Sequence, residues 1–424
     1  MTQASGKKGG RLWKHGDFVR FWFGMSVSNF GNQITNLALP TIAILLLHIT
    51  IFEVGLLGTI EYLAYPAIGL FVGVWVDRFR RKPILIACNL GRLVSLASIP
   101  IAYLLNVLSI YQIFAVAGVN GVFSVFFDVA YQSYLPSLVD PSDLVEGNSK
   151  LQTTASAATV IGPGLAGFLI NLVGAAESIA VDALGYLTSI LAMLSIRKKE
   201  ERPSDARPDR PPRSFASEMR EGIALIIHSP VLASLTGCVS TINFGTTLAS
   251  SVYVYFAYNE LHLTPLLVGI VGSAGGLAFL IGALTASRVS EYLGIGRALT
   301  FSILTGFGYI GYPLALVLPA LPTLIAFSFI ASSGVLIFNI TALSMMQKTT
   351  PNELLGRMTA TRRTISWGVI PVASLLGGVL GSVIGIPATI IIGGSISGGA
   401  VLWALLGPIY RLKEVSDLDV APTA

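Results

Sequence analysis

Residues 51–87 read IFEVGLLGTIEYLAYPAIGLFVGVWVDRFRRKPILIA, a long apolar run, a basic break and the start of a second apolar run. About 20 apolar residues span the hydrocarbon core of a bilayer as a helix, because lipid offers the backbone no other hydrogen-bond partners. The break holds four basic residues, Arg78, Arg80, Arg81 and Lys82. Two apolar runs around a charged break predict a chain that crosses a membrane and turns back.

The same alternation continues towards both ends of the chain, which divides into about twelve apolar runs. The 27 Lys and Arg residues fall before the first run, after the last and in every second connection, except for Arg92 inside the third run. The other connections, such as residues 48–53, 259–264 and 319–322, hold no Lys or Arg. Cytoplasmic loops retain positive charge, so we expect a multi-pass protein of the cell membrane with both termini in the cytoplasm.

Composition argues against several other classes of protein. Charged residues make up 12% of the chain, against roughly 25% in soluble domains, and the mean hydropathy is +0.73. The net charge of +5 follows from the basic loops and requires no nucleic-acid partner. The two cysteines lie in different runs, and the histidines are scattered near run ends or in loops, at His15, His48, His228 and His262. We therefore expect no enzyme, no metal site and no cofactor.

The apolar runs fall into two sets of six. Residues 197–220 include RKKEERP and several Arg-Pro pairs, a composition too polar and proline-rich for a buried helix. The sequence thus predicts an all-α membrane protein with twelve transmembrane helices in two six-helix bundles. The expected segments are a cytoplasmic tail (1–17), an N-terminal bundle (18–196), a cytoplasmic linker (197–222), a C-terminal bundle (223–411) and a second cytoplasmic tail (412–424).

Short features of the first half recur in the second half at a constant spacing. Pro141, Asp143, Leu144, Ser156 and Gly167 return 210 positions later as Pro351, Glu353, Leu354, Ser366 and Gly377. The triplet Asn29-Phe30-Gly31 returns 214 positions later as Asn243-Phe244-Gly245. Because six is an even number, the halves keep the same orientation, as in transporters whose halves rock around a central site. A duplication without such a mechanism is the alternative.

The break after the second run carries a recognisable motif. Its sequence GVWVDRFRRK (73–82) resembles the loop signature of the major facilitator superfamily, a Gly followed four residues later by Asp-Arg and a basic cluster. The resemblance implies that Gly73 permits close helix contact and that Asp77 accepts hydrogen bonds from the other half, stabilising the outward-open state. Arg78 and Arg81 would pair with nearby carboxylates. Arg80 stands where the superfamily usually has Gly. The alternative interpretation of Arg80 is that its charge only helps to set the orientation of the chain in the membrane.

A second motif lies in the fifth run. The sequence ATVIGPGLAG (158–167) resembles the Gly-Pro antiporter motif of export members of that superfamily. Gly162 and Gly167 would let helices approach closely, and Pro163 would bend its helix. A plain packing motif of membrane helices has the same appearance, so both interpretations remain open.

Three longer stretches of the N-terminal half narrow the resemblance. SNFGNQ (28–33), FFDVAYQSYLP (126–136) and EGNSKL (146–151) resemble bacterial exporters of the enterobactin and macrolide type. Many members of that group have Asp where this chain has Asn32. The substitution removes one candidate proton carrier, so the coupling mechanism cannot be transferred unchanged from these relatives.

Three carboxylates lie within the predicted membrane segments, where ionisable groups are costly and therefore suspected of function. Glu61 faces a stripe of small residues deep in the second run, where desolvation favours its protonated form. It is the first candidate to carry a coupling proton. Asp182 is the second candidate, although it could equally serve to bond helix ends. Asp128 and Arg92 lie at comparable depth, and we expect them to form a structural or gating salt bridge.

Uncharged polar residues follow helical spacing on the first, fourth and seventh runs. In the superfamily these helices belong to the set that lines the central pathway, and the stripes therefore predict a hydrated substrate cavity. Hydrogen bonding between helices without a ligand is the alternative. The candidate cavity residues are Asn29, Asn32, Gln33, Asn36, Asn120, Ser124, Tyr131, Asn243, Thr247 and Tyr253.

These features together predict a secondary transporter that exports small amphipathic molecules, such as a drug, a siderophore or a metabolite, by proton-coupled alternating access. Na⁺ in place of the proton remains open, as does a nutrient importer with the same fold. The expected partners are the lipid bilayer, the small-molecule substrate and the coupling ion. The superfamily resemblance also implies a monomer.

Overall fold

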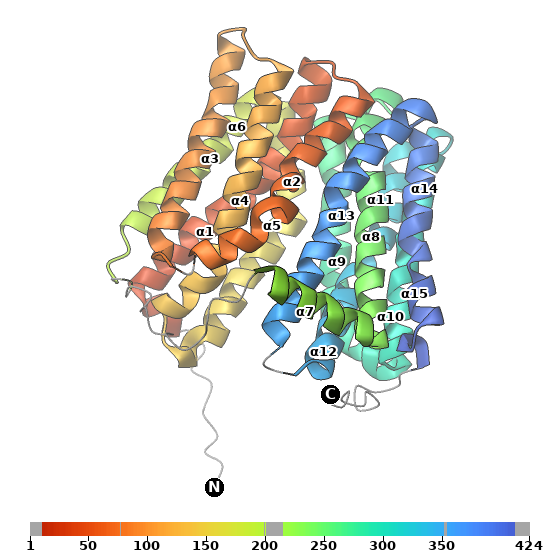
Figure 1. The fold of residues 1–424 in the computed structure, drawn as a ribbon. Helices are drawn as coiled ribbons and strands as arrows, with labels where there is room; N and C mark the ends of the chain where they lie inside the picture. The colour runs from red at the N-terminus through yellow and green to blue at the C-terminus, as the bar shows by residue number, and fades with distance from the viewer. Residues whose placement is uncertain (1–10, 77, 199, 201–214, 352–353, 412–424) are drawn as a thin grey trace.

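The computed structural model describes residues 11–76, 78–198, 200, 215–351 and 354–411. Every regular element within these ranges is a helix. The helices form two bundles that stand side by side, coloured red to yellow and green to blue in Figure 1. This confirms the predicted all-α fold.

The N-terminal bundle contains six long helices, preceded by the short 3-10 helix η1 (Arg11–Lys14). They are α1 (Gly16–Thr41), α2 (Ile51–Val76), α3 (Arg81–Leu104), α4 (Ile110–Leu138), α5 (Leu144–Val173) and α6 (Ala175–Leu194). Helix α1 packs against α5 and α6, α3 against α4 and α6, and α2 against α4. The six helices thereby surround a common interior.

The C-terminal bundle repeats this plan with several helices broken in two. Its elements are α8 (Pro230–Tyr255), α9 (Pro265–Leu293), α10 (Ile295–Leu304) with the 3-10 segment η5 (Thr305–Leu316), α11 (Ala320–Ser333), α12 (Val335–Thr349), α13 (Leu355–Val383), α14 (Ile386–Gly399), α15 (Val401–Leu406) and η6 (Ile409–Arg411). Three pairs of pieces, α10 with η5, α11 with α12 and α14 with α15, follow each other along the chain as single spans.

The internal repeat is visible in the backbone. The first helix of each bundle ends in a π-helical turn, η2 (Ile42–Leu46) after α1 and η4 (Phe256–Glu260) after α8. Each turn is followed by a histidine in the left-handed region, His48 and His262, both with φ of 51°. Non-glycine residues seldom adopt this conformation. Its recurrence 214 positions apart, the spacing of the Asn-Phe-Gly triplets, indicates that both halves share one backbone plan.

Eleven helices of the described residues are long and apolar enough to cross a membrane. Helix α1 is not among these eleven, although it has 26 residues, the same length as α2. Its serines and asparagines lower its mean hydropathy, and it nevertheless packs within the bundle as the other spans do. With α1 included, the arrangement is the predicted one of six helices in each bundle.

One helix lies where the sequence predicted part of the linker. Helix α7 (Phe215–His228) begins inside the expected linker range 197–222 and crosses the end of the C-terminal bundle rather than running along it (Figure 1). It packs against α13 and α8. Ile226 on one face is 5% exposed, whereas Ile227 is 69% exposed. This amphipathic pattern lets α7 cover the bundle with one face, so the polar segment ends earlier than expected.

The two ends of the bundles differ in charge. We call the end that carries Arg81, Lys150, Arg197 and Lys348 the basic end, and the opposite end the neutral end. At the neutral end, one apolar core includes Ile44 and Ile49 of the N-terminal bundle together with Tyr258 and Val268 of the C-terminal bundle. The bundles are therefore joined by burial of apolar surface at this end.

Candidate functional site

The N-terminal bundle encloses a polar cavity of about 350 Å³ between α1, α2, α3, α4 and α5. It brings together nine residues that the sequence singled out: Asn29, Asn32, Asn36, Glu61, Arg92, Asn120, Ser124, Asp128 and Tyr131. It also contains residues that the sequence reasoning missed, chiefly Tyr62, Tyr65, Phe127 and Gln152. Tyr65 follows Glu61 by one helical turn and therefore lies on the same face of the helix. This spacing could have identified Tyr65 as a cavity residue.

A close approach of two helices positions Glu61. A Cβ atom added to Gly121 of α4 would lie 2.3 Å from the carbonyl oxygen of Glu61 on α2. Only glycine leaves room for this backbone contact. The Glu61 side chain is half-buried and lines the cavity. No ion pair of Glu61 occurs among the residues that the structure describes.

Asp128 belongs to a ring of four side chains that crosses between the bundles. The Tyr65 hydroxyl donates a hydrogen bond of 2.8 Å to Asp128 Oδ2, and Arg363 of α13 lies 4.0 Å from the same oxygen. The Arg363 guanidinium is 4.4 Å from the centre of the Trp367 ring. Trp367 packs against Tyr65 with ring centres 4.7 Å apart. We call Tyr65, Asp128, Arg363 and Trp367 the cross-bundle ring.

The predicted salt bridge between Arg92 and Asp128 is wrong. Arg92 Nη2 donates instead to Ser124 Oγ at 2.8 Å. The guanidinium also lies over the rings of Phe127, at 4.8 Å, and Tyr186, at 5.7 Å. Ser124 precedes Asp128 by one helical turn on α4, so the offset between α3 and α4 brings Arg92 to the hydroxyl rather than to the carboxylate.

Asp182 lies behind the cavity wall rather than in it. Its side chain is fully buried between α6 and α1, where the Thr35 hydroxyl donates to Oδ2. A Cβ atom on Gly31 would be 2.0 Å from Oδ1, which has no hydrogen-bond partner among the described residues. The nearby Tyr186 hydroxyl donates to Asn32, a cavity residue. The proton-carrying role of Asp182 stays a prediction.

The structure describes Gly73, Arg78 and Arg81 of the loop signature. Asp77 lies outside the described residues. A Cβ atom on Gly73 would meet no described atom within 4 Å, so the close helix contact expected at Gly73 stays a prediction. Arg78 is exposed. Arg81 lies 3.7 Å from Glu200, whose carboxylate also accepts the backbone N–H of Arg81 at 2.8 Å.

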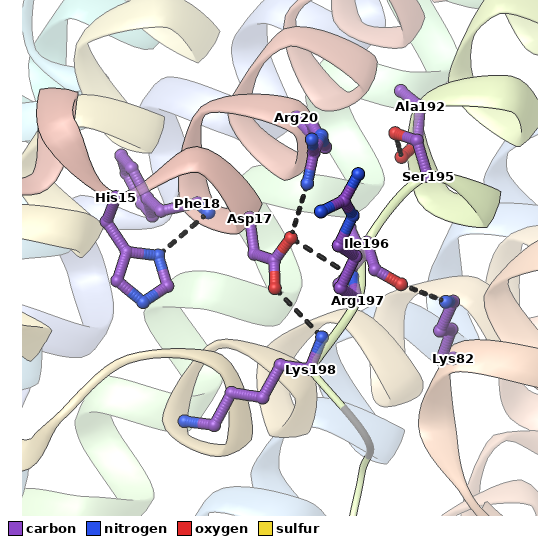
Figure 2. Close-up of polar contacts among 10 residues, drawn as sticks. All are labelled: His15, Asp17, Phe18, Arg20, Lys82, Ala192, Ser195, Ile196, Arg197 and Lys198. Carbon is purple, nitrogen blue, oxygen red and sulfur yellow. Dashed lines mark hydrogen bonds and ion pairs between the residues drawn. The ribbon is translucent and has the colours of Figure 1, made fainter.

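The beginning of the linker is attached to the N-terminal bundle at the basic end (Figure 2). The Asp17 carboxylate accepts the backbone N–H groups of Arg197 and Lys198, at 3.0 and 2.8 Å. Arg20 donates to the same carboxylate, and Lys82 Nζ donates to the Ile196 carbonyl at 2.8 Å. Partial burial raises the pKa of Asp17, but the hydrogen bonds from Arg197, Lys198 and Arg20 outweigh it and hold the pKa below 3.8.

The Gly-Pro motif packs α5 against both bundles. A Cβ atom on Gly162 would lie 2.5 Å from the Gln33 side chain of α1, so Gln33 points to α5 and does not line the cavity. On the side of α9, a Cβ atom on Gly167 would lie 2.4 Å from the Pro265 carbonyl oxygen. One on Gly269 would lie 2.3 Å from the Pro163 carbonyl oxygen. These positions bring the two helices into backbone contact.

A second interface between the bundles joins α2 to α13. Ser374 Oγ donates to the Gly55 carbonyl at 2.9 Å, and a Cβ atom on Gly55 would lie 2.6 Å from Gly378 Cα. The Thr41 hydroxyl at the end of α1 and the Tyr258 hydroxyl of η4 share a hydrogen bond of 2.8 Å. All these contacts lie toward the neutral end, so the bundles are closed against each other there.

Besides Gln33, three predicted cavity residues of the C-terminal bundle do not line the polar cavity. Asn243 lines a separate cavity of about 50 Å³ inside the C-terminal bundle, and its amide donates to the Ser366 carbonyl at 2.8 Å. Thr247 does not line the polar cavity, and Tyr253 packs against Tyr312. A cavity shared by α1, α4 and α8 therefore stays a prediction for these three residues. The helical stripe showed which face of α8 is polar but not what that face contacts.

The architecture, the paired bundles and the enclosed polar cavity correspond to a known family. The sequence model of the Major Facilitator Superfamily matches residues 21–366 and, in a second match, 235–421. The chain belongs to the Major Facilitator Superfamily. This superfamily consists of transporters that handle small molecules, and the resemblance inferred from the loop signature is confirmed.

Two of the relatives that this chain resembles are exporters by name. The multidrug efflux pump Tap of Mycolicibacterium fortuitum is 23% identical over 89% of this chain and 92% of its own. The enterobactin exporter EntS of Citrobacter koseri is 24% identical over 94% of each chain. Among solved structures, a bacterial homologue of the iron transporter ferroportin in its inward-facing state has a TM-score of 0.69. It is 15% identical and covers 92% of this chain and 98% of its own.

Proposed function

We propose that this superfamily member exports small amphipathic molecules by alternating access coupled to proton entry. The observation that carries the proposal is the cavity of the N-terminal bundle. Two carboxylates, Glu61 and Asp128, line it together with asparagine amides and tyrosine rings. Such a wall binds molecules with both polar and apolar parts, and the exporting relatives support the outward direction.

The orientation of the bundles supports the same direction. By the distribution of positive charge, the basic end faces the cytoplasm. The neutral end is closed by the contacts of α2 with α13 and of α5 with α9. A substrate would therefore reach the cavity from the cytoplasm or the inner leaflet. Opening of the neutral end would then release it outside.

Glu61 is the residue to which we assign the coupling proton. It lines the cavity and forms no ion pair with another described residue, so protonation does not have to break one. A carboxyl in that position can take up a proton from outside and release it inside as the cavity changes sides. Asp182 is the second candidate, because it is buried and, among the residues that the structure describes, its carboxylate has the Thr35 hydroxyl alone as hydrogen-bond partner.

Inverted membrane vesicles with an imposed proton gradient provide the test, with ethidium, Nile red and fluorescein as probes. We expect the chain to accumulate at least one probe and to release protons when that probe is added. Glu61→Gln should abolish both signals while the protein stays in the membrane. Glu53→Gln is the matched control, because Glu53 lies on the same helix but caps its first turn through Thr50.

Each outcome of this experiment is informative. Full accumulation by Glu61→Gln would exclude Glu61 as the proton site and leave Asp182. Accumulation only in right-side-out vesicles would favour the alternative, a proton-coupled importer of a small nutrient. Accumulation without a proton gradient but with a Na⁺ gradient would identify Na⁺ as the coupling ion.

A further inference from the structure

The charged groups of the cavity are unequally accessible. Arg92 is only 4% exposed, and its guanidinium is held by Ser124 and covered by aromatic rings. Asp128 has 37% of its side chain exposed, and Glu61 is half-buried. A molecule that enters the cavity therefore meets carboxylates before it meets the cation of α3. The exposed cation beside Asp128 is Arg363, so a positively charged ligand can bind Asp128 if it takes the place of Arg363.

The contact of Asp128 with the other bundle is weak. Arg363 lies 4.0 Å from the carboxylate oxygen, and 36% of its side chain is exposed. Ion pairs with this separation and exposure contribute little to stability. Arg363 therefore neutralises Asp128 in the empty cavity without being firmly bound to it. A second cation of suitable shape can take its place.

The same ring offers a surface for the rest of such a ligand. Tyr65 and Trp367 flank the Asp128–Arg363 contact, with ring centres 4.7 Å apart. The face of Trp367 already binds a guanidinium, at 4.4 Å. Aromatic faces attract cations through the ring quadrupole, most strongly for tryptophan. A delocalised cation with an aromatic or apolar body thus fits both components of the site.

We propose that the ligand of this cavity is an organic cation that binds Asp128 in place of Arg363. The inference rests on the proposed function, since it takes the cavity to be the transport site, and it adds the charge of the substrate. Binding separates Arg363 from Asp128 and so removes an ion pair between α4 and α13. Ligand binding is thereby linked to the relative motion of the bundles.

Two ions of nearly identical shape and opposite charge test this assignment. We would measure binding of tetraphenylphosphonium and of tetraphenylborate to the purified full chain in detergent, without any ion gradient. We expect the wild type to bind the cation and not the anion. Asp128→Asn should weaken cation binding at least tenfold, whereas Asp128→Glu should retain most of it, which shows that a loss does not come from misfolding.

Arg363→Gln gives the more specific result. Because the ligand no longer competes with the arginine, the cation should bind roughly 1.5- to 5-fold more tightly, the range that corresponds to an exposed ion pair. The matched control is Arg357→Gln on the same helix, where Arg357 pairs with Glu221 of α7. Its affinity for the cation should equal that of the wild type.

The proposal would be overturned by binding of tetraphenylborate, by binding of neither ion, or by a cation affinity that Asp128→Asn leaves unchanged. Weaker cation binding in Arg363→Gln would contradict the competition. The assay uses no gradient and measures no transport. A failure of proton-coupled export in vesicles would therefore appear independently of this result.

Discussion

At the residue scale, glycines of neighbouring helices make room for the segments that carry Glu61 and Asp182. Gly121 allows the backbone of Glu61 to approach α4, and Gly31 leaves space for the buried carboxyl of Asp182. Both glycines lie within helices, where glycine is unfavourable compared with alanine. Their presence in these helices is therefore explained by packing, against the Glu61 backbone for Gly121 and against the Asp182 carboxyl for Gly31, rather than by helix propensity.

Gly31→Ala tests this explanation. Its Cβ atom would lie 2.0 Å from Asp182 Oδ1, and such overpacking lowers stability by about 1–3 kcal/mol. We expect a lower midpoint of thermal unfolding in detergent, restored in part by the additional substitution Asp182→Ala. Gly399→Ala is the control, because a Cβ atom there has no neighbour within 4 Å. Equal midpoints for Gly31→Ala and the control would mean that the Asp182 carboxyl can move aside freely.

At the scale of elements, the beginning of the linker is part of the N-terminal bundle. Asp17 at the start of α1 holds the backbone after α6, and Glu200 accepts the backbone N–H groups of Arg81 and Lys82 at the start of α3, at 2.8 and 3.0 Å. A carboxylate at a helix N-terminus is stabilised by the unpaired N–H groups and the helix dipole. These contacts attach the linker to one bundle over its first residues.

Asp17→Asn should loosen this attachment. An uncharged amide accepts backbone hydrogen bonds more weakly than a carboxylate, with a loss of about 1 kcal/mol. We expect faster hydrogen exchange at the amides of Arg197 and Lys198, measured by mass spectrometry, with unchanged exchange in the interior of α4. Unaltered exchange at those two amides would show that Asp17 does not hold them in solution.

Acid should reproduce the effect in the wild type. Because the pKa of Asp17 is lower in the folded protein than its ordinary value of 3.8, the carboxylate contributes stability above that value. The contribution is lost as the pH falls through the lowered pKa, since protonation removes the charge that the N–H groups bind. The amides of Arg197 and Lys198 should therefore lose their protection from hydrogen exchange below about pH 4. The Asp17→Asn variant should show no such loss with falling pH.

At the scale of the whole molecule, closure of the neutral end depends on backbone contact between the bundles. Glycines on α5, α9, α2 and α13 lie where any side chain would collide with the opposite helix. In the alternating-access cycle that we propose, these contacts would be lost when the neutral end opens. The balance between the two states is therefore sensitive to the volume of these few residues.

Gly269→Val should shift that balance toward a state open at the neutral end. Even one added carbon would lie 2.3 Å from the Pro163 carbonyl oxygen in the closed state. We expect a cysteine placed at Thr41, which is buried against Tyr258 in the closed state, to react faster with a membrane-impermeant maleimide. The experiment uses a background without Cys88 and Cys238. Gly399→Val, the control, should leave the rate unchanged, and an unchanged rate in Gly269→Val would contradict the proposed closure.

The sequence by itself determined the membrane character, the two six-helix halves, the family and most of the polar wall. These features depend on hydropathy, charge distribution and helical periodicity, which are properties of local stretches. It also placed Glu61, Asp128 and Arg92 in one interior, because each is too polar to face lipid. For α7, the amphipathic spacing after residue 215 was present but was obscured by the proline-rich segment before it.

Only the tertiary structure decided which of these groups meet. Arg92 binds Ser124 rather than Asp128, Gln33 faces Gly162 rather than the cavity, and Asp128 finds its cation on α13, far along the chain. Such pairings depend on the rotation and axial offset of neighbouring helices. A shift of one turn, or a rotation of a fraction of a turn, exchanges one partner for another while the sequence pattern of each helix stays the same.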